Sequence, residues 1–135
     1  MTNKERALRE FLNLDKAQKI EFENDCFRTE GTGEEYLVLT DEEADQIAGD
    51  YIKESVWAFR ADFLLGYLPE GMTTEAIEAI QENCESANSP ILAMIGYRLE
   101  DFIQDAIASD GRGHFISTYD GNENEQGNFF IYRTN

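Results

Sequence analysis

The sequence is poor in the residues that thiol and metal chemistry require. Its 135 residues include two cysteines, Cys26 and Cys84, and one histidine, His114. The cysteines form no CxxC pair and there is no second histidine, so the ligand spacing of a zinc site is missing. We therefore expect no metal and no cofactor. Cys84 falls on a predicted apolar helix face, where a buried, inert thiol is the usual outcome.

Basic residues are also scarce. The chain has 28 Asp and Glu against 11 Lys and Arg, a formal net charge of −17 at pH 7. Phosphate groups need clustered cations, so direct binding to nucleic acid or anionic lipid is excluded. A halophilic origin would also give an acidic chain. It would favour Asp and few large apolar residues, whereas Glu outnumbers Asp 18 to 10 and nine Phe are present.

Long apolar runs are absent as well. No segment approaches the ~20 residues of a membrane helix, and the first six residues lack the apolar region of a signal peptide. We therefore expect a cytoplasmic protein with no membrane partner. Hydrophobic residues still make up 41% of the chain, which is enough for a packed core and excludes an entirely disordered acidic tail. The length predicts a single domain over residues 1–135.

The hydrophobic pattern predicts an α+β fold with about four helices and a small, mainly antiparallel sheet. Helices are expected over residues 3–13, 41–59, 74–86 and 91–108, with shorter helical pieces at 15–19 and 62–67. Strands are expected at 20–28, 35–39, 114–119 and 128–132, and the last two would form a C-terminal β-hairpin. Thr40 and Glu43 match a capping box, which predicts a helix start at Asp41.

The charge is uneven along the chain. Residues 1–30 carry six cations and seven anions, whereas residues 31–135 carry five cations and 21 anions. The first part is thus a near-neutral, helical N-terminal segment with a net charge of −1, and the second is an acidic α+β body with a net charge of −16. Because the N-terminal segment is nearly neutral, it is a surface through which two copies could pair as a homodimer.

Four glutamates share one face of the predicted helix 74–86. At 100° per residue they fall within an arc of about 80°, opposite Ile77 and Ile80; they are Glu75, Glu78, Glu82 and Glu85. Like charges at this spacing cost a few tenths of a kcal/mol per pair. The row is either an ordinary solvated face or an imitation of the phosphates of a nucleic-acid strand.

Two further acidic groups include a large aromatic side chain. On the predicted helix 41–59, one sector contains Glu43, Asp50, Glu54 and Trp57, and on the predicted helix 91–108 the outward residues include Tyr97, Asp101 and Asp105. Trp and Tyr dominate binding hot spots, so we take both groups as candidate partner-binding surfaces. The alternative for Trp57 is that another element buries it. A fourth acidic cluster is Asp120, Glu123 and Glu125.

Known catalytic and ligand motifs are missing. Gly111 and Gly113 flank Arg112 but are expected to lead into a strand, so they do not form a phosphate loop. The segment from Asp120 begins like a calcium loop, but Glu125 stands where that loop requires glycine. No P-loop, G-x-S-x-G or HExxH sequence is present. We therefore expect a protein that is not an enzyme. A Cys–His dyad of His114 with Cys26 or Cys84 is the enzymatic alternative.

Several segments resemble small acidic proteins encoded by bacteriophages and prophages. They are EYLVLTDEEAD (35–45), YIKESVWAF (51–59), GRGHFISTYDG (111–121) and FIYRTN (130–135). The resemblance implies a phage accessory protein of the anti-CRISPR or anti-restriction type, whose members are often partly DNA-mimicking. It implies a host-cell location, and a basic nucleic-acid-binding protein or complex as the partner. An acidic adaptor of some other basic protein is the alternative.

Overall fold

The computed structural model describes all 135 residues, which form two compact units. Unit 1 comprises residues 1–48 and 111–135, and unit 2 comprises residues 49–110. The boundaries fall within one helix and after another, not at residue 30. Residues 1–30 share a core with the C-terminal strands in unit 1. They are therefore not a separate helical segment, while the single-domain assignment stays a prediction.

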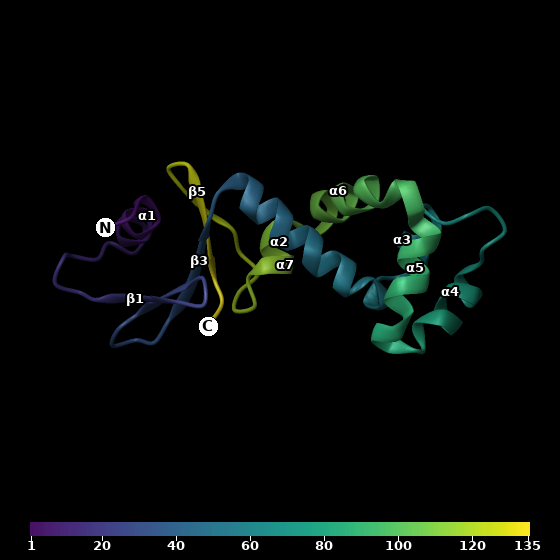
Figure 1. The fold of residues 1–135 in the computed structure, drawn as a ribbon, viewed down its shortest axis with the longest axis horizontal. Coiled ribbons are helices and arrows are strands. Elements are labelled where there is room, and N and C mark those ends of the chain that lie inside the picture. Colours follow the sequence, from purple (N-terminus) through teal and green to yellow (C-terminus); the bar gives the residue numbers. More distant parts are fainter. The chain divides into compact units, whose positions relative to one another are not determined.

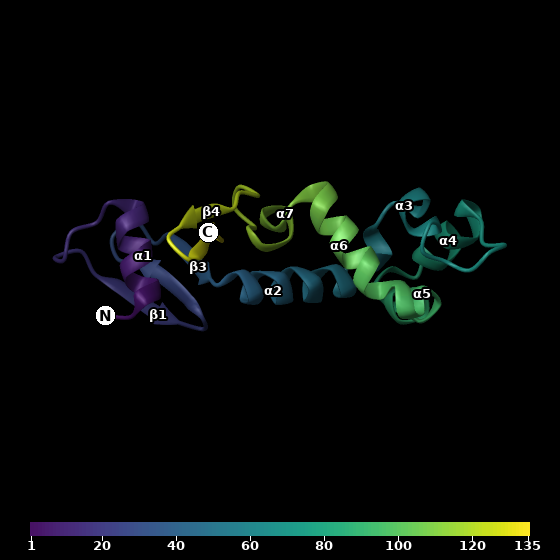
Figure 2. The ribbon, with the colours of Figure 1, turned by 90° about the horizontal axis from the view of Figure 1, so that it is seen from above.

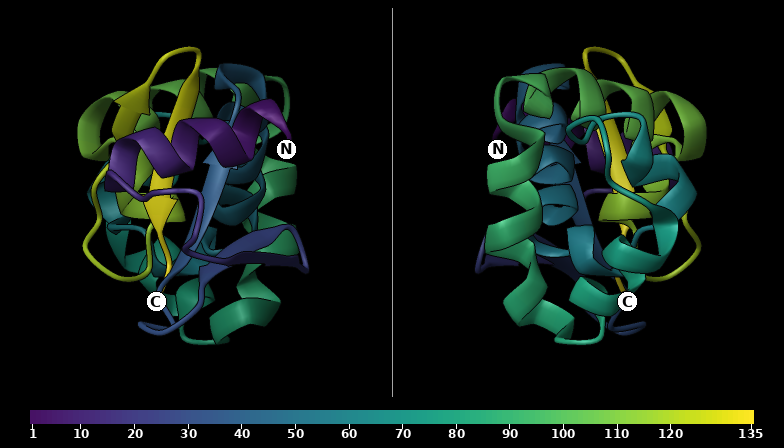
Figure 3. Two further views of the ribbon diagram at one scale, coloured as in Figure 1. Left: turned by 90° about the vertical axis from the view of Figure 1, so that its left-hand side faces the viewer. Right: turned by 90° about the vertical axis from the view of Figure 1, so that its right-hand side faces the viewer.

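Unit 1 is built on a five-stranded antiparallel sheet in the order β1-β2-β3-β5-β4 (Figure 1). Its strands are β1 (Ile20–Glu23), β2 (Cys26–Thr29), β3 (Glu35–Leu39), β4 (Asn124–Gln126) and β5 (Phe129–Arg133). Helix α1 (Asn3–Leu12) crosses one face of the sheet (Figure 3, left) and buries a core there, comprising Leu8, Phe27, Tyr36, Val38 and Ile131. The α+β class with a C-terminal hairpin is thereby confirmed.

The N-terminal part of unit 1 differs from the prediction in two places. Residues 15–19 form turns instead of a helix. The expected strand 20–28 is two strands, because Asn24 and Asp25 adopt φ values of 54° and 63° and close a tight hairpin. Asn and Asp tolerate this left-handed region better than other non-glycine residues, so the pair is a turn signal within the predicted strand.

The C-terminal hairpin pairs β5 with β4, not with residues 114–119. The expected strand there is wrong, because Arg112–Ile116 form the short helix α7. Gly111 and Gly113 thus lead into a helix. A Cβ on Gly113 would lie 2.4 Å from the carbonyl oxygen of Gly121, so only glycine allows the polar loop to pack against α7. A segment of five residues is too short for its hydrophobic periodicity to separate helix from strand.

Unit 2 is helical and includes the second half of α2 (Asp41–Glu54). The other helices are α3 (Ala61–Leu65), α4 (Thr74–Gln81), α5 (Asn88–Ile95) and α6 (Leu99–Asp110), with 3₁₀ turns at Val56–Ala58, Cys84–Ala87 and Gly96–Arg98. Helices α3 and α4 lie side by side (Figure 2). The Phe102 ring packs within 6 Å of the rings of Phe59, Phe63 and Tyr67. None of the helices has the length and hydrophobicity that a membrane crossing requires.

The helices of unit 2 are shorter than expected. Helix α2 ends at Glu54 and α4 ends at Gln81. The predicted helix 91–108 is interrupted at Gly96, whose φ of 57° and ψ of −126° are not helical. Helical periodicity continues through each break, so the pattern alone did not reveal them. The apolar face was nevertheless right, since Ile91, Ile95 and Phe102 are fully buried.

Candidate partner-binding surface

Of the predicted binding residues, only Glu43 lies in unit 1. Unit 2 contains twelve Asp and Glu against three Lys and Arg, a net charge of −9, and unit 1 contains sixteen against eight, a net charge of −8. The two units thus carry similar net charge. They differ in what their carboxylates contact.

In unit 1 most of the ion pairs are structural. Arg112 is 10% exposed, and its guanidinium contacts Asp41 at 2.7 Å, Asp45 at 3.1 Å and Glu123 at 2.7 Å. The guanidinium carbon also lies 4.6 Å from the centre of the Phe130 ring. Burial works against the charged form, but hydrogen bonds to Glu123 and Asp41 outweigh it and raise the pKa of Arg112. Arg112 therefore joins α2, α7 and the C-terminal strands.

Glu43 has structural partners of its own, at the start of α2 and on α1. Its carboxylate accepts a hydrogen bond from the Thr40 backbone N–H at 2.9 Å, and its own N–H donates to the Thr40 hydroxyl at 3.2 Å. The predicted capping box and the helix start at Asp41 are therefore confirmed. The Lys4 ammonium lies 2.8 Å from the same carboxylate. Hydrogen bonding from Lys4, followed by that from Thr40, lowers the pKa of Glu43.

The predicted cluster Asp120, Glu123 and Glu125 is also mainly structural. Glu123 contacts Arg112 and accepts a hydrogen bond from the Tyr132 hydroxyl. Asp120 accepts from the Asn122 backbone N–H at 3.0 Å, which lowers its pKa. Two of the three carboxylates therefore hold their own loop in place, and only Glu125 has no side-chain partner.

The four glutamates around α4, in contrast, have no structural partners. All are exposed, and no ion pair or hydrogen bond involves the carboxylate of Glu75, Glu78, Glu82 or Glu85. They do not form one helical stripe as predicted. Glu82 is the C-terminal cap of α4, and Glu85 lies in the following 3₁₀ turn, after Cys84 enters the left-handed region at φ 53°. The predicted single face is therefore wrong beyond Gln81, but the carboxylates remain in water.

The predicted group of Asp50, Glu54 and Trp57 differs from residue to residue in exposure and contacts. Asp50 pairs with Lys53 at 3.5 Å, while the Glu54 side chain is exposed. Trp57 lies in a 3₁₀ turn after α2 and is half-buried. Its backbone N–H donates to Asn88 at 2.9 Å, and Asn88 in turn donates to the Glu54 carbonyl oxygen at 2.5 Å. Trp57 is therefore fixed against the start of α5 and presents only part of its ring to solvent.

Tyr97 is the most exposed aromatic residue, at 92%. It lies in the 3₁₀ turn between α5 and α6, and Asp101 is exposed on the first turn of α6. Asp105 accepts a hydrogen bond from the Tyr67 hydroxyl, and burial together with this bond raises the pKa of Tyr67 to about 12. The side chains of Asp101 and Tyr97 are thus accessible to a partner protein, whereas Asp105 is hydrogen-bonded to Tyr67 within the chain.

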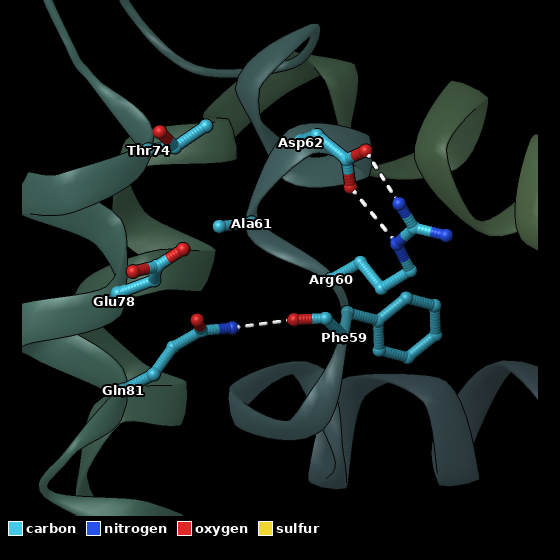
Figure 4. A pocket seen from close by; sticks show the side chains of 7 residues that line it. All are labelled: Phe59, Arg60, Ala61, Asp62, Thr74, Glu78 and Gln81. Carbon is cyan, nitrogen blue, oxygen red and sulfur yellow. Dashed lines mark hydrogen bonds and ion pairs between the residues drawn. The ribbon is translucent and has the colours of Figure 1, made fainter.

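An open cleft of about 490 Å³ lies between α3 and α4 (Figure 4). It is lined by Phe59, Arg60, Ala61, Asp62, Thr74, Glu78 and Gln81. Arg60 pairs with Asp62 at 2.9 Å, and the Gln81 amide nitrogen donates to the Phe59 carbonyl oxygen at 2.6 Å. Of these residues, only Glu78 was predicted to bind a partner. The cleft arises from the packing of two helices, for which the local sequence contains no signal.

The thiols and the histidine are not brought together by any hydrogen bond. Cys26 is half-buried, and burial followed by the nearby Glu35 carboxylate raises its pKa. Cys84 is exposed, so its predicted burial is wrong. His114 lies on α7 with its ring edge-on to Phe115, at 5.0 Å between centroids. No group of three or more His, Cys, Asp or Glu is placed to hold a metal ion.

No family model matches the chain, and no curated protein or solved structure is significantly similar to it.

Proposed function

We propose that this protein binds the positively charged nucleic-acid-binding surface of another protein and blocks that surface with the carboxylates of unit 2. The resemblance to phage accessory proteins favours a host defence complex as the target, either a CRISPR effector or a restriction enzyme. The chain itself then acts as an inhibitor and performs no chemistry.

The supporting observation is the set of exposed carboxylates without partners around α4. Helix surfaces usually mix charge signs, because unpaired like charges oppose one another. Here Glu75, Glu78 and Glu82 form no ion pair, whereas seven of the nine ion pairs lie in unit 1. A partner rich in Arg and Lys would supply the missing cations and would be attracted over long distances.

Aromatic residues on the same unit would add contact energy. Tyr97 is almost fully exposed and Trp57 is partly so. Side chains of this type contribute disproportionately when an interface removes them from water. Binding should therefore combine a salt-sensitive electrostatic part with a less salt-sensitive aromatic part.

The test is capture of partners from a bacterial lysate by the full chain, compared with the variant Glu75→Lys/Glu78→Lys/Glu82→Lys. We expect the full chain to retain a nucleic-acid-binding protein that is released by added duplex DNA and by high salt. The variant should lose it. A captured protein that duplex DNA does not displace would favour the adaptor alternative, and undiminished capture by the variant would exclude this surface.

A further inference from the structure

The cleft between α3 and α4 is lined by two carboxylates, one guanidinium, a hydroxyl, an amide and two apolar residues. Glu78 contributes a carboxylate that no residue of the chain contacts, and Thr74 contributes a hydroxyl on the same helix. Figure 4 shows both on α4, facing the segment of Ala61 and Asp62 across the cleft. A ligand suited to such walls is one that donates several hydrogen bonds and carries positive charge.

Gln81 strengthens this preference. Its amide nitrogen is committed to the Phe59 carbonyl oxygen at 2.6 Å, so the amide orientation is fixed. The side-chain oxygen of Gln81 then remains as an acceptor one turn away from Glu78 on α4 (Figure 4). Asp62 on the opposite wall is already engaged, because both of its oxygens contact Arg60, at 3.2 and 2.9 Å. The open acceptors therefore belong to Glu78 and Gln81.

The chemistry of the cleft distinguishes among cations. A metal ion is not favoured, since no three ligating side chains converge anywhere in the molecule. A guanidinium group is planar and donates from a rigid fork that matches a carboxylate in a two-point contact, with further N–H groups left for an amide oxygen. The volume of about 490 Å³ lies within the range of about 300–1,000 Å³ found for ligand sites, so a side chain fits easily.

We propose that the cleft between α3 and α4 binds an arginine side chain of the partner protein, with Glu78 and Gln81 as its acceptors. This inference rests on the proposed function. It specifies that an arginine of the basic partner is bound, and that this cleft binds it. The Arg60–Asp62 pair shows that one wall of the cleft already holds a guanidinium from within the chain. The Arg60 side chain is 84% exposed, and Figure 4 shows it pointing away from Glu78 and contacting Asp62.

The experiment is an NMR titration of the full chain with a hexa-arginine peptide and, separately, with N-acetyl-arginine amide. A hexa-citrulline peptide, which has the same shape without the charge, is the neutral control, and a hexa-lysine peptide tests the need for the planar fork. We expect the arginine peptide to shift the amide signals of Ala61 and the Gln81 side chain first. N-acetyl-arginine amide should shift the same signals with lower affinity, and the citrulline peptide should shift none.

The matched variants are Glu78→Gln and Glu75→Gln. Both remove one exposed, unpaired carboxylate from α4, but only Glu78 lines the cleft. Glu78→Gln should weaken arginine-peptide binding about tenfold, as expected for loss of a charged hydrogen bond, and Glu75→Gln should weaken it less than about twofold.

Equal weakening by the two variants, or equal affinity for lysine and arginine peptides, would overturn the cleft as an arginine site and leave the proposed function standing. Absence of any binding to the basic peptides would overturn both.

Discussion

Units 1 and 2 carry almost the same net charge but arrange it in opposite ways. Seven of the nine ion pairs lie in unit 1. Four of them connect segments distant in sequence, namely Lys4–Glu43, Arg112–Asp41, Arg112–Asp45 and Arg133–Glu34. The two in unit 2, Asp50–Lys53 and Arg60–Asp62, join close sequence neighbours on the surface. In unit 1 several carboxylates therefore connect distant parts of the fold. In unit 2 the glutamates around α4 form no ion pair.

The ion pairs of the two units also differ in how much they contribute to the free energy of unfolding. An exposed pair of sequence neighbours contributes little, commonly below about 1 kcal/mol. A guanidinium removed from water and surrounded by three carboxylates contributes more, because loss of one partner leaves the others uncompensated. The role of an acidic residue therefore depends on the groups that it contacts, and amino-acid composition alone does not predict it.

The largest expected effect tests how tightly unit 1 is packed. Gly113→Ala places a Cβ 2.4 Å from the Gly121 carbonyl oxygen, a backbone atom that cannot move cheaply, so we expect a loss of about 3 kcal/mol or more. Gly49→Ala in unit 2 is the control. Its Cβ would meet only the Ile103 side chain at 3.7 Å within a helix, and we expect unchanged or improved stability. Urea unfolding of both variants measures the difference, and equal stability would contradict the close packing at α7.

The second effect concerns the ion pairs. Arg112→Met should lower the free energy of unfolding by about 2 kcal/mol, less than for a fully buried pair because the carboxylates keep part of their hydration. Arg60→Met in unit 2 should change it by less than about 0.5 kcal/mol. Amide hydrogen exchange in α1 and α6 reports on the two units separately. A loss of protection in α6 that matches the loss in α1 after Arg112→Met would contradict a role confined to unit 1.

The third effect concerns neutralised glutamates, which should change stability in opposite directions in the two units. The triple variant Glu75→Gln/Glu78→Gln/Glu82→Gln removes like-charge repulsion and should stabilise unit 2 by about 0.5 kcal/mol. Glu123→Gln in unit 1 should be destabilising, since Glu123 contacts both Arg112 and Tyr132. Thermal unfolding of the two variants at low salt gives the comparison. Destabilisation by the triple variant would show that these glutamates have structural partners after all.

The smallest effect is a pH dependence located in unit 1. The folded-state pKa of Glu43 lies below its usual value of 4.5, so its contribution to stability is present above that pH and is lost as the pH falls through the folded pKa. Lys4→Met should raise the pKa of Glu43 and weaken this dependence, because the Lys4 ammonium is the largest cause of the shift. A carboxyl-carbon NMR titration measures it directly. An unchanged Glu43 pKa in Lys4→Met would refute the assigned cause.

The fold class was accessible from sequence because its signals are local. Helix α1, strand β3 and the capping box at Thr40 were predicted at or within a residue of their true bounds. The failures also have local causes. Gly96 interrupts a helix whose apolar periodicity continues, and Asn24 with Asp25 turns what reads as one strand.

The sequence could not predict which acidic residues have structural partners and which have none. The Arg112 contact with Asp41 spans 71 residues, so the structural role of Asp41, Asp45 and Glu123 depends on the tertiary fold. The same holds for Glu43, where the cap was predicted but the contact with Lys4 was not. Of the candidate cleft, only Glu78 was identified, because Gln81 and Thr74 acquire their position from the packing of α3 against α4.

The most direct measurement is the affinity of the captured partner for two variants of equal net charge. One neutralises Glu75, Glu78 and Glu82 in unit 2, and the other neutralises Glu30, Glu42 and Glu125 in unit 1, which are also exposed and form no ion pair. We predict that the unit 2 variant loses most of its affinity and most of its salt dependence, while the unit 1 variant binds like the unmodified chain. Equal losses in the two variants would contradict a binding surface on unit 2 and would mean that net charge alone attracts the partner.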